Sequence, residues 1–268
     1  MSELDPAAWR AALRERLSAG LQTAFSIDDG LLAAFEGGSA ATGRADEYSD
    51  IDLNIVARGQ VHPSLFDCVE RLVREVGAIT HLWHNAELPW PGTVQRFYFI
   101  EGAPRFFVLD CVLLVPEAAP ELLEVERHGN AQVLFDRAGC LQPRQLDRAA
   151  HGRRMARRLA QMDGSRPLYR MLVDKELARA RPLDAFGFYL ALLRMNVELA
   201  GMLHRPDRFD FGWRYLHVDL PESLAAELQS VTCGADLQQI GSHLPLVDQL
   251  HGQLRAQVER AGLSPSVD

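Results

Sequence analysis

Two aspartates, Asp50 and Asp52, are the residues of this 268-residue chain whose type and spacing point most directly to chemistry. They open an expected strand, Asp50 to Val56, in which carboxylate and aliphatic side chains alternate. Residues two apart in a strand point to the same face, so both carboxylates lie on one side while Ile51 and Leu53 enter the core. Two such carboxylates repel unless a hard divalent cation lies between them, and Mg²⁺ bridging to substrate phosphates is the usual occupant.

A third acid, Asp110, interrupts the otherwise apolar strand from Phe106 to Val115. An acid inside such a strand is costly unless it is paired or bound to a metal, so we expect Asp110 to face the same site from a neighbouring strand. Three acids can hold the two ions that clamp the attacking and leaving oxygens of an in-line phosphoryl displacement. A buried acid paired with an arginine is the structural alternative for Asp110.

A glycine-rich stretch, Gly37 to Gly43 (GGSAATG), follows a short apolar strand from Leu31 to Glu36. Such a turn exposes backbone N–H groups and a hydroxyl, which can hold a triphosphate without a bulky side chain in the way. It is not a P-loop, because the G-x-x-x-x-G-K-[ST] spacing is absent. The alternative is an ordinary glycine turn beside a solvated acidic strand edge, which is disfavoured because Asp is rare in strands.

Basic residues supply further phosphate candidates. Arg44 follows the glycine turn directly, and Lys175 is the single lysine of the chain. Another set forms two i,i+4 pairs of like charge on an expected helix: Arg153, Arg154, Arg157 and Arg158. Like charges at that spacing repel on an isolated helix. A bound triphosphate would relieve the repulsion, and so would solvent or neighbouring acids, so both interpretations stay open.

The pattern Gly38-Ser39-x-Ala41-x-Gly43, five residues, then Ser49-Asp50-Ile51-Asp52-Leu53 resembles the signature of the polymerase β-like nucleotidyltransferase superfamily. The match covers the N-terminal half of the chain. The resemblance implies that Gly38 and Ser39, with Arg44 beside them, hold the phosphates of a nucleoside triphosphate, expected to be ATP. It also implies that Asp50 and Asp52 bind Mg²⁺ while an acceptor hydroxyl attacks the α-phosphorus and expels pyrophosphate. Asp110 would complete a site for two Mg²⁺ ions or take the proton from the hydroxyl, and geometry must choose between these roles.

The elements around these residues predict an α+β fold: a mixed β-sheet domain with packed helices over residues 1–142, then an α-helical bundle over residues 143–268. We expect a helix from Asp5-Pro6 to Gly20 and another from His62-Pro63-Ser64 to Gly77. The other expected strands are Ala78 to His84, Val94 to Ile100, Arg105 to Val115, and a short one from Val133 to Phe135. Turn residues 102–104 join the strands on either side of them as a hairpin.

No strand-like alternation continues after Pro143. The expected helices there are Arg144 to Met162, Leu168 to Ala180, Asp184 to Leu203, Pro221 to Val231, and Leu237 to Arg260. Breaks such as Asp163-Gly164-Ser165 leave loops short enough for an antiparallel bundle. A catalytic sheet followed by such a bundle is similar to the antibiotic nucleotidyltransferases, which implies an aminoglycoside-like or lincosamide-like acceptor and a substrate-binding role for the helical domain.

The net charge of −8 and the pI near 5.6 argue against broad binding to nucleic acid, which needs a basic surface. The four cysteines form no C-x-x-C pair and the N-terminus has no apolar signal region, so we expect no zinc, no disulfide and a reducing cytoplasm. The uninterrupted apolar runs are too short to span a membrane.

Three alternatives to a small-acceptor enzyme stay open, as does the choice between a monomer and a homodimer. The chain could transfer the nucleotide to a protein or RNA hydroxyl, although the acidic pI disfavours RNA. It could bind nucleotide as a sensor or interaction protein without turnover, for which the three intact acids are unfavourable. A toxin–antitoxin role is the third, and the long helical domain disfavours it.

Overall fold

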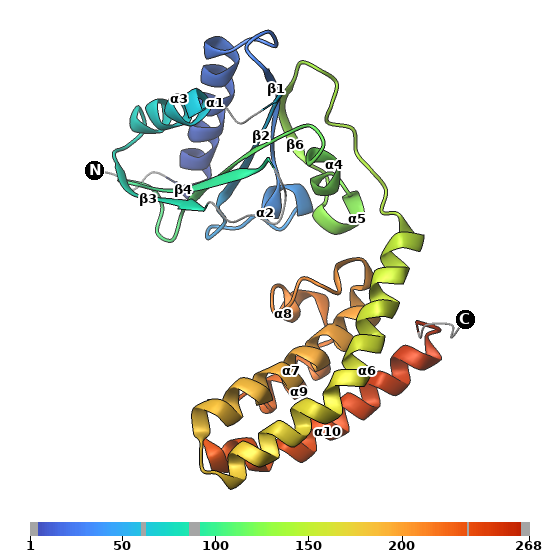
Figure 1. Cartoon of the computed structure of the whole chain (residues 1–268). Coiled ribbons are helices and arrows are strands. Elements are labelled where there is room, and N and C mark those ends of the chain that lie inside the picture. The colour runs from blue at the N-terminus through green and yellow to red at the C-terminus, as the bar shows by residue number, and fades with distance from the viewer. Residues whose placement is uncertain (1–4, 60–62, 86–91, 235, 264–268) are drawn as a thin grey trace. The chain divides into compact units, whose positions relative to one another are not determined.

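The computed structural model describes residues 5–59, 63–85, 92–234 and 236–263. It divides into two compact units, Met1–Gln145 and Leu146–Asp268 (Figure 1), where the sequence predicts a boundary between residues 142 and 143. The sheet unit contains α1 (Pro6–Ala24), β1 (Leu31–Glu36), α2 (Gly38–Thr42), β2 (Ile51–Ala57), α3 (Pro63–Arg74), β3 (Ile79–Asn85), β4 (Val94–Ile100), β5 (Leu109–Leu114), α4 (Ala119–Leu122), α5 (Val125–His128) and β6 (Gln132–Asp136). The helical unit contains α6 (Arg148–Ala178), α7 (Pro182–His204), a 3₁₀ turn (Pro206–Arg208), α8 (Leu216–Asp219), α9 (Glu222–Ser230) and α10 (Leu237–Arg260).

The six strands form one sheet in the order β3-β4-β5-β2-β1-β6. The neighbours β2 and β5 run parallel, and every other neighbouring pair is antiparallel. The α+β fold with a mixed sheet followed by a helical region is therefore confirmed. The hairpin of β4 and β5 is also confirmed, but β5 begins later than expected. A turn precedes it, in which the Phe107 amide donates to the Pro104 carbonyl and Phe106 has a φ of +69°.

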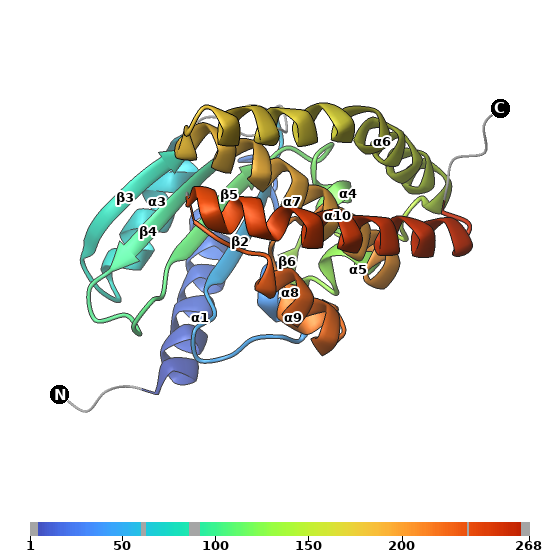
Figure 2. The same ribbon diagram turned by 90° about the horizontal axis from the view of Figure 1, so that it is seen from below.

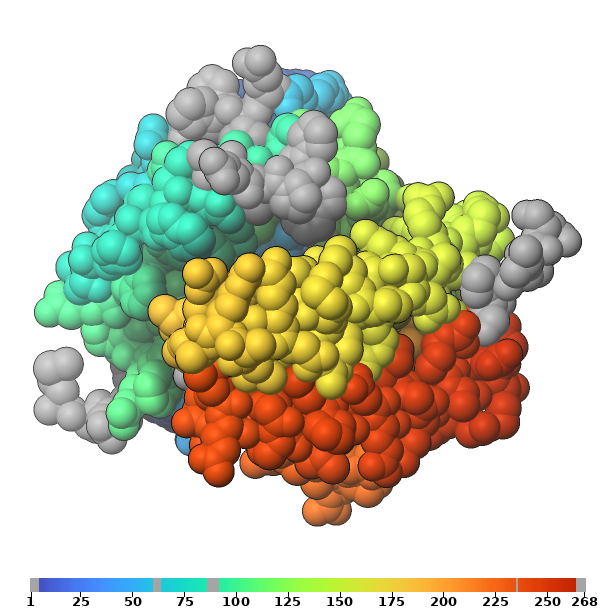
Figure 3. All heavy atoms as spheres, turned by 60° about the horizontal axis from the view of Figure 1, so that its bottom comes forward, coloured from blue at the N-terminus to red at the C-terminus, as the bar shows by residue number. Residues whose placement is uncertain are grey.

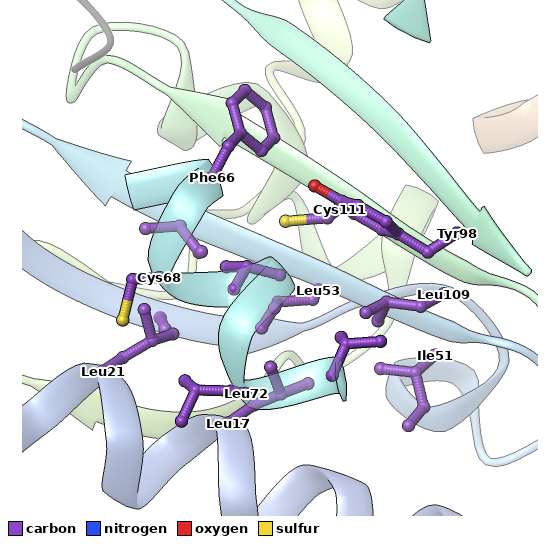
Figure 4. Close-up of a cluster of buried hydrophobic side chains, with 14 of the residues drawn as sticks. Leu17, Leu21, Ile51, Leu53, Phe66, Cys68, Leu72, Tyr98, Leu109 and Cys111 are labelled. Atoms are coloured by element: carbon purple, nitrogen blue, oxygen red, sulfur yellow. The ribbon is translucent and has the colours of Figure 1, made fainter. Parts of the chain in front are cut away.

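Helices α1 and α3 cover one face of the sheet, and the main hydrophobic core lies between these helices and the sheet (Figure 4). Helix α1 begins at Asp5, whose side chain accepts a hydrogen bond from the Ala8 amide, and it runs four residues beyond the expected end at Gly20. The start of α3 predicted at His62 falls outside the described residues. Ile51 and Leu53 of β2 are buried in this core, as the alternation predicts.

The opposite face of the sheet carries a smaller apolar cluster that includes Val56 of β2 and Leu114 of β5. Both residues lie at the carboxyl ends of these parallel strands. At the amino ends of the same strands, the same face carries Asp52 and Asp110. The apolar cover of this face therefore lies toward the other end of β2 and β5 from the two acids.

In the helical unit, α7 is the central helix, and α6 and α10 both pack along it (Figure 2). Figure 3 shows α6 and α10 side by side on the surface of this unit. The bounds of α10 are those that the sequence predicts. Helix α7 is long and apolar enough to cross a membrane, but 56% of its most apolar window is buried. Packing against α6 and α10 accounts for its apolar character.

The expected break at Asp163-Gly164-Ser165 is wrong: α6 is one continuous helix of 31 residues that contains Pro167. Ion pairs to α10 lie on both sides of the proline. Arg166 and Arg170 both bind Asp248, at 2.6 and 2.9 Å. Tertiary contacts with α10 thus offset the local cost of a proline inside the helix.

Candidate active site

The three acids that the sequence singles out come from two neighbouring strands. Asp52 on β2 and Asp110 on β5 are direct partners in the parallel register, so their side chains leave the same face of the sheet from strands roughly 4.8 Å apart. Asp50 lies immediately before β2, and its Oδ1 accepts a hydrogen bond of 2.8 Å from the amide of Val108, which lies immediately before β5. All three acids therefore lie at the amino ends of these two strands.

The glycine turn lies directly against Asp52. The Gly37 amide donates to the Asp52 carbonyl at 2.9 Å, which joins the end of β1 to β2. Gly38 then opens α2 with a φ of +55°, and a Cβ at this position would lie 1.7 Å from Asp52 Oδ2. Only glycine fits this backbone and this close approach. The two halves of the motif are thus in contact, and Ser39 follows at the beginning of α2.

Two arginines of α1, which the sequence analysis missed, hold the chain before the glycine turn and between the two halves of the motif. Arg14 forms a bidentate ion pair with Glu36, the last residue of β1, whose side chain is 1% exposed. The hydrogen bonds to Glu36 raise the pKa of Arg14 above its ordinary value. Buried Arg10 donates to the carbonyls of Asp46, at 2.9 Å, and of Glu47 and Ser49, both at 3.3 Å. These contacts fix the chain just before Gly37 and just before Asp50.

The carboxyl of Asp50 is half-buried. Burial raises its pKa above the ordinary value, because desolvation disfavours the charged form. The hydrogen bond from the Val108 amide and the positive charge of Arg10 act in the opposite direction. A cation beside Asp50 would stabilise the charged form further.

Asp110 is held by an amide network that the sequence analysis also missed. The Gln95 Nε2 of β4 donates to both carboxylate oxygens of Asp110, at 2.8 and 2.9 Å. The Asn85 Nδ2 of β3 in turn donates to Gln95 Oε1 at 3.0 Å. The alternation of β4 in the sequence predicts that Gln95 lies on the same face of the sheet as Phe97. Only the strand register, in which Phe97 pairs with Asp110, shows that this face also carries Asp110. This network fixes the orientation of the Asp110 carboxylate.

Carboxylate oxygens on the neighbouring strands β2 and β5 are the ligands that a hard divalent cation prefers. Gly38 leaves open the space beside Asp52 that a side chain would fill. Within the described part of the chain, no three His, Cys, Asp or Glu side chains are grouped closely enough to hold a metal ion as they stand. Asp50 and Asp110 each accept hydrogen bonds from the protein. Metal binding by all three acids stays a prediction.

The basic candidates lie in different units. The Arg44 amide donates to the Ser39 carbonyl at 3.0 Å, so Arg44 closes the glycine turn, and its side chain is half-buried. On α6, the Arg154 guanidinium contacts His151 Nδ1 at 2.9 Å and Arg158 pairs with Glu198. Arg153, Arg157 and Lys175 are exposed on the same helix. The side chains of Arg154 and Arg158 thus have partners within the helical unit. Contact of this helix with a triphosphate stays a prediction.

Comparison with family models gives no match, and comparison with curated proteins gives none. Among solved structures, the chain is similar to an aminoglycoside 6-adenyltransferase from Bacillus subtilis (15% identity, 96% of this chain and 93% of that one, TM-score 0.37). It is similar to a nucleotidyltransferase-like protein from Exiguobacterium sibiricum (12% identity, 92% of this chain and 80% of that one, TM-score 0.41). It is also similar to a spectinomycin adenyltransferase from Enterococcus faecialis, solved with ATP and spectinomycin (13% identity, 91% of this chain and 99% of that one, TM-score 0.37). At these TM-scores, the case for function rests on the residues of the site.

Proposed function

We propose that this protein is a Mg²⁺-dependent nucleotidyltransferase that moves a nucleoside monophosphate from a nucleoside triphosphate, ATP first among them, to a hydroxyl of a small acceptor. One observation carries the proposal: Asp52 and Asp110 face each other across β2 and β5, with the carboxylate of Asp52 packed against Gly38. The paired acids and the glycine turn are therefore in contact with each other. We place the reaction in the cytoplasm, where the four free cysteines are compatible with a reducing environment.

In this mechanism the glycine turn with Ser39 binds the β- and γ-phosphates, and Arg44 supplies positive charge beside them. Asp50, Asp52 and Asp110 would hold Mg²⁺, which neutralises charge on the phosphates when it is bound. The acceptor oxygen forms the new bond to the α-phosphorus, the bond to the pyrophosphate oxygen breaks, and pyrophosphate leaves. The Gln95 amide keeps Asp110 oriented, as a metal ligand or as the base that receives the hydroxyl proton.

The charge of the sheet unit supports a cationic acceptor. Residues 1–145 contain 21 Asp and Glu against 12 Arg, so this unit is far more acidic than the helical unit. An acidic surface attracts a cationic small molecule and repels a polyanion such as RNA. An aminoglycoside, spectinomycin or a lincosamide is therefore the first acceptor to test.

The test is Mg²⁺-dependent pyrophosphate release from each of the four nucleoside triphosphates, with a pool of these antibiotics and mass spectrometry of the acceptors. Asp52→Asn removes a charge at the site, and Asp67→Asn is the matched control on the exposed side of α3. We expect release that requires an acceptor, falls at least about 100-fold in Asp52→Asn and is unchanged in Asp67→Asn. The mass shift of the modified compound identifies the acceptor.

A titration with ATP and Mg²⁺ separates the outcomes in which no pyrophosphate appears. Binding of ATP without turnover, with every acceptor tried, would favour a sensor or interaction protein over the enzyme. Absence of nucleotide binding would refute the nucleotidyltransferase proposal altogether.

A further inference from the structure

Four ring side chains of β3 and β4 stand on one face of the sheet. Trp83 and Phe97 are stacked, with ring centroids 5.1 Å apart and planes 14° apart. His81 and Phe99 form an edge-to-face pair with centroids 5.6 Å apart. Trp83 is 54% exposed and Phe99 is 46% exposed. We name these four residues the ring wall.

The ring wall stands on the face that carries the acids. In the strand register Trp83 pairs with Phe97, Phe97 with Asp110, and Asp110 with Asp52. Residues that face each other across neighbouring strands share a face of the sheet. One row across four strands therefore reads Trp83, Phe97, Asp110 and Asp52, two rings followed by two carboxylates.

The core of the unit does not explain these rings. The alternate residue of β4, Tyr98, points to the other face and is fully buried in the core under α1 and α3. Leu82, its register partner, is also on that other face. Trp83 lies on β3, the edge strand, and leaves more than half of its surface exposed. An exposed group of large rings beside a polar site is a common mark of a ligand-binding surface.

The spacing of the row indicates where a ligand ring would lie. Trp83 and Phe97 occupy neighbouring strands, and the next strand in the row, β5, carries the small side chain of Asp110 in place of a third ring. A ring packed against Phe97 would continue the stack and lie above Asp110. The reacting hydroxyl of such a molecule would then be within reach of the carboxylates.

We propose that the ring wall, and Trp83 with Phe97 in particular, binds the acceptor and sets its specificity. The ligand class is an amino-substituted saccharide or cyclitol ring, whose C–H face packs on the rings. Its ammonium groups are attracted by the aromatic faces and by the acidic charge of residues 1–145. The inference rests on the proposed function for the existence of an acceptor, but its residues are separate from those that bind the nucleotide.

The test measures binding rather than turnover. Kanamycin, streptomycin, spectinomycin and lincomycin are titrated calorimetrically into the full-length wild type, Trp83→Ala, Trp83→Phe and Leu82→Ala, and ATP with Mg²⁺ is titrated into the same proteins. Leu82→Ala is the matched control, since Leu82 neighbours Trp83 on the same strand but faces the other side of the sheet. We expect the dissociation constant of at least one antibiotic to rise about 3- to 10-fold in Trp83→Ala. It should recover in Trp83→Phe and stay unchanged in Leu82→Ala, with ATP binding equal in all four proteins.

Equal antibiotic affinity of wild type and Trp83→Ala would overturn the ring wall as an acceptor site. So would the absence of binding by the wild type to every antibiotic tested. In both cases retained ATP binding would leave the nucleotidyltransferase proposal standing, so the two failures are distinguishable. A change in the oligomeric state of Trp83→Ala in solution, without a change in its antibiotic affinity, would show that the ring wall is a subunit interface and would also overturn the proposal.

Discussion

Gly38→Ala tests the contact between the two halves of the motif. The new Cβ would lie 1.7 Å from Asp52 Oδ2, and contacts of a real Cβ below 3.0 Å are essentially never seen. The Asp52 carboxylate must therefore move by about 1.3 Å, and a displacement of about 1 Å in a catalytic constellation costs about 100-fold in rate. Gly139→Ala is the matched control, because Gly139 also has positive φ, +63°, lies outside the glycine turn, and has no atom within 4 Å of the place that its new methyl group would take.

The two variants share the backbone cost but differ in the contact. An alanine in the left-handed region costs about 1–2 kcal/mol of folding stability, offset in part by the smaller entropy of the unfolded chain. Since the Asp52 side chain can rotate away, Gly38→Ala should lose little more stability than Gly139→Ala. We therefore expect similar urea midpoints for the two variants, and a loss of about 100-fold in pyrophosphate release for Gly38→Ala alone.

The assay combines urea unfolding followed by circular dichroism with pyrophosphate release at saturating ATP and Mg²⁺. Wild-type activity of Gly38→Ala would refute the reasoning, because it would show that the position of the Asp52 carboxylate does not matter to the reaction. Equal loss in both variants, in step with lost stability, would refute it too. In that case the strained backbone, and not the contact with Asp52, would account for the effect.

Two further predictions concern stability. Glu36→Leu removes the buried carboxylate that pairs with Arg14, whose side chain is 28% exposed, so urea unfolding should show a loss of about 2 kcal/mol. The double variant with Arg14→Leu should regain a part of this loss, and an unchanged midpoint for Glu36→Leu would contradict the prediction. Burial lowers the pKa of His251, bonded to Asn196, to about 4 from an unfolded value near 6.5. The unfolded chain therefore takes up this proton first, so stability is full above about pH 6.5 and falls by about 3 kcal/mol toward pH 4. His251→Gln should flatten unfolding midpoints measured across that range, and equal slopes in both proteins would contradict the assignment.

The parts of the site that sequence reasoning reaches are those set by local pattern. Period-two alternation places Asp50 and Asp52 opposite Ile51 and Leu53, and the burial of the two aliphatic residues agrees with it. The glycine turn follows the strand that ends at Glu36, as its composition predicts. Both inferences depend on only a few consecutive residues, for which backbone geometry alone decides which way a side chain points.

Long-range pairing decides the rest, and no local pattern contains it. The continuity of α6 through residues 163–165 depends on Asp248 of α10, some 80 positions away in the chain. In the sequence, nothing distinguishes Arg10 and Arg14 from other arginines on helices. Only the fold brings Arg10 to the loop before Asp50 and Arg14 to the end of β1.

The row of Trp83, Phe97, Asp110 and Asp52 is the clearest case of such long-range pairing. Its members come from four strands, and shifting the register of β4 against β5 by one residue would turn both Phe97 and Gln95 away from Asp110. The strand order β3-β4-β5-β2 brings the exposed rings of β3 and β4 to the side of the sheet next to the acids, although β2 precedes β3 in the chain. Acceptor recognition, as proposed for the ring wall, is thus a property of strand order and register, while the proposed phosphate and metal roles rest on one short motif together with Asp110 of β5. Sequence motifs can therefore indicate the reaction without indicating the acceptor.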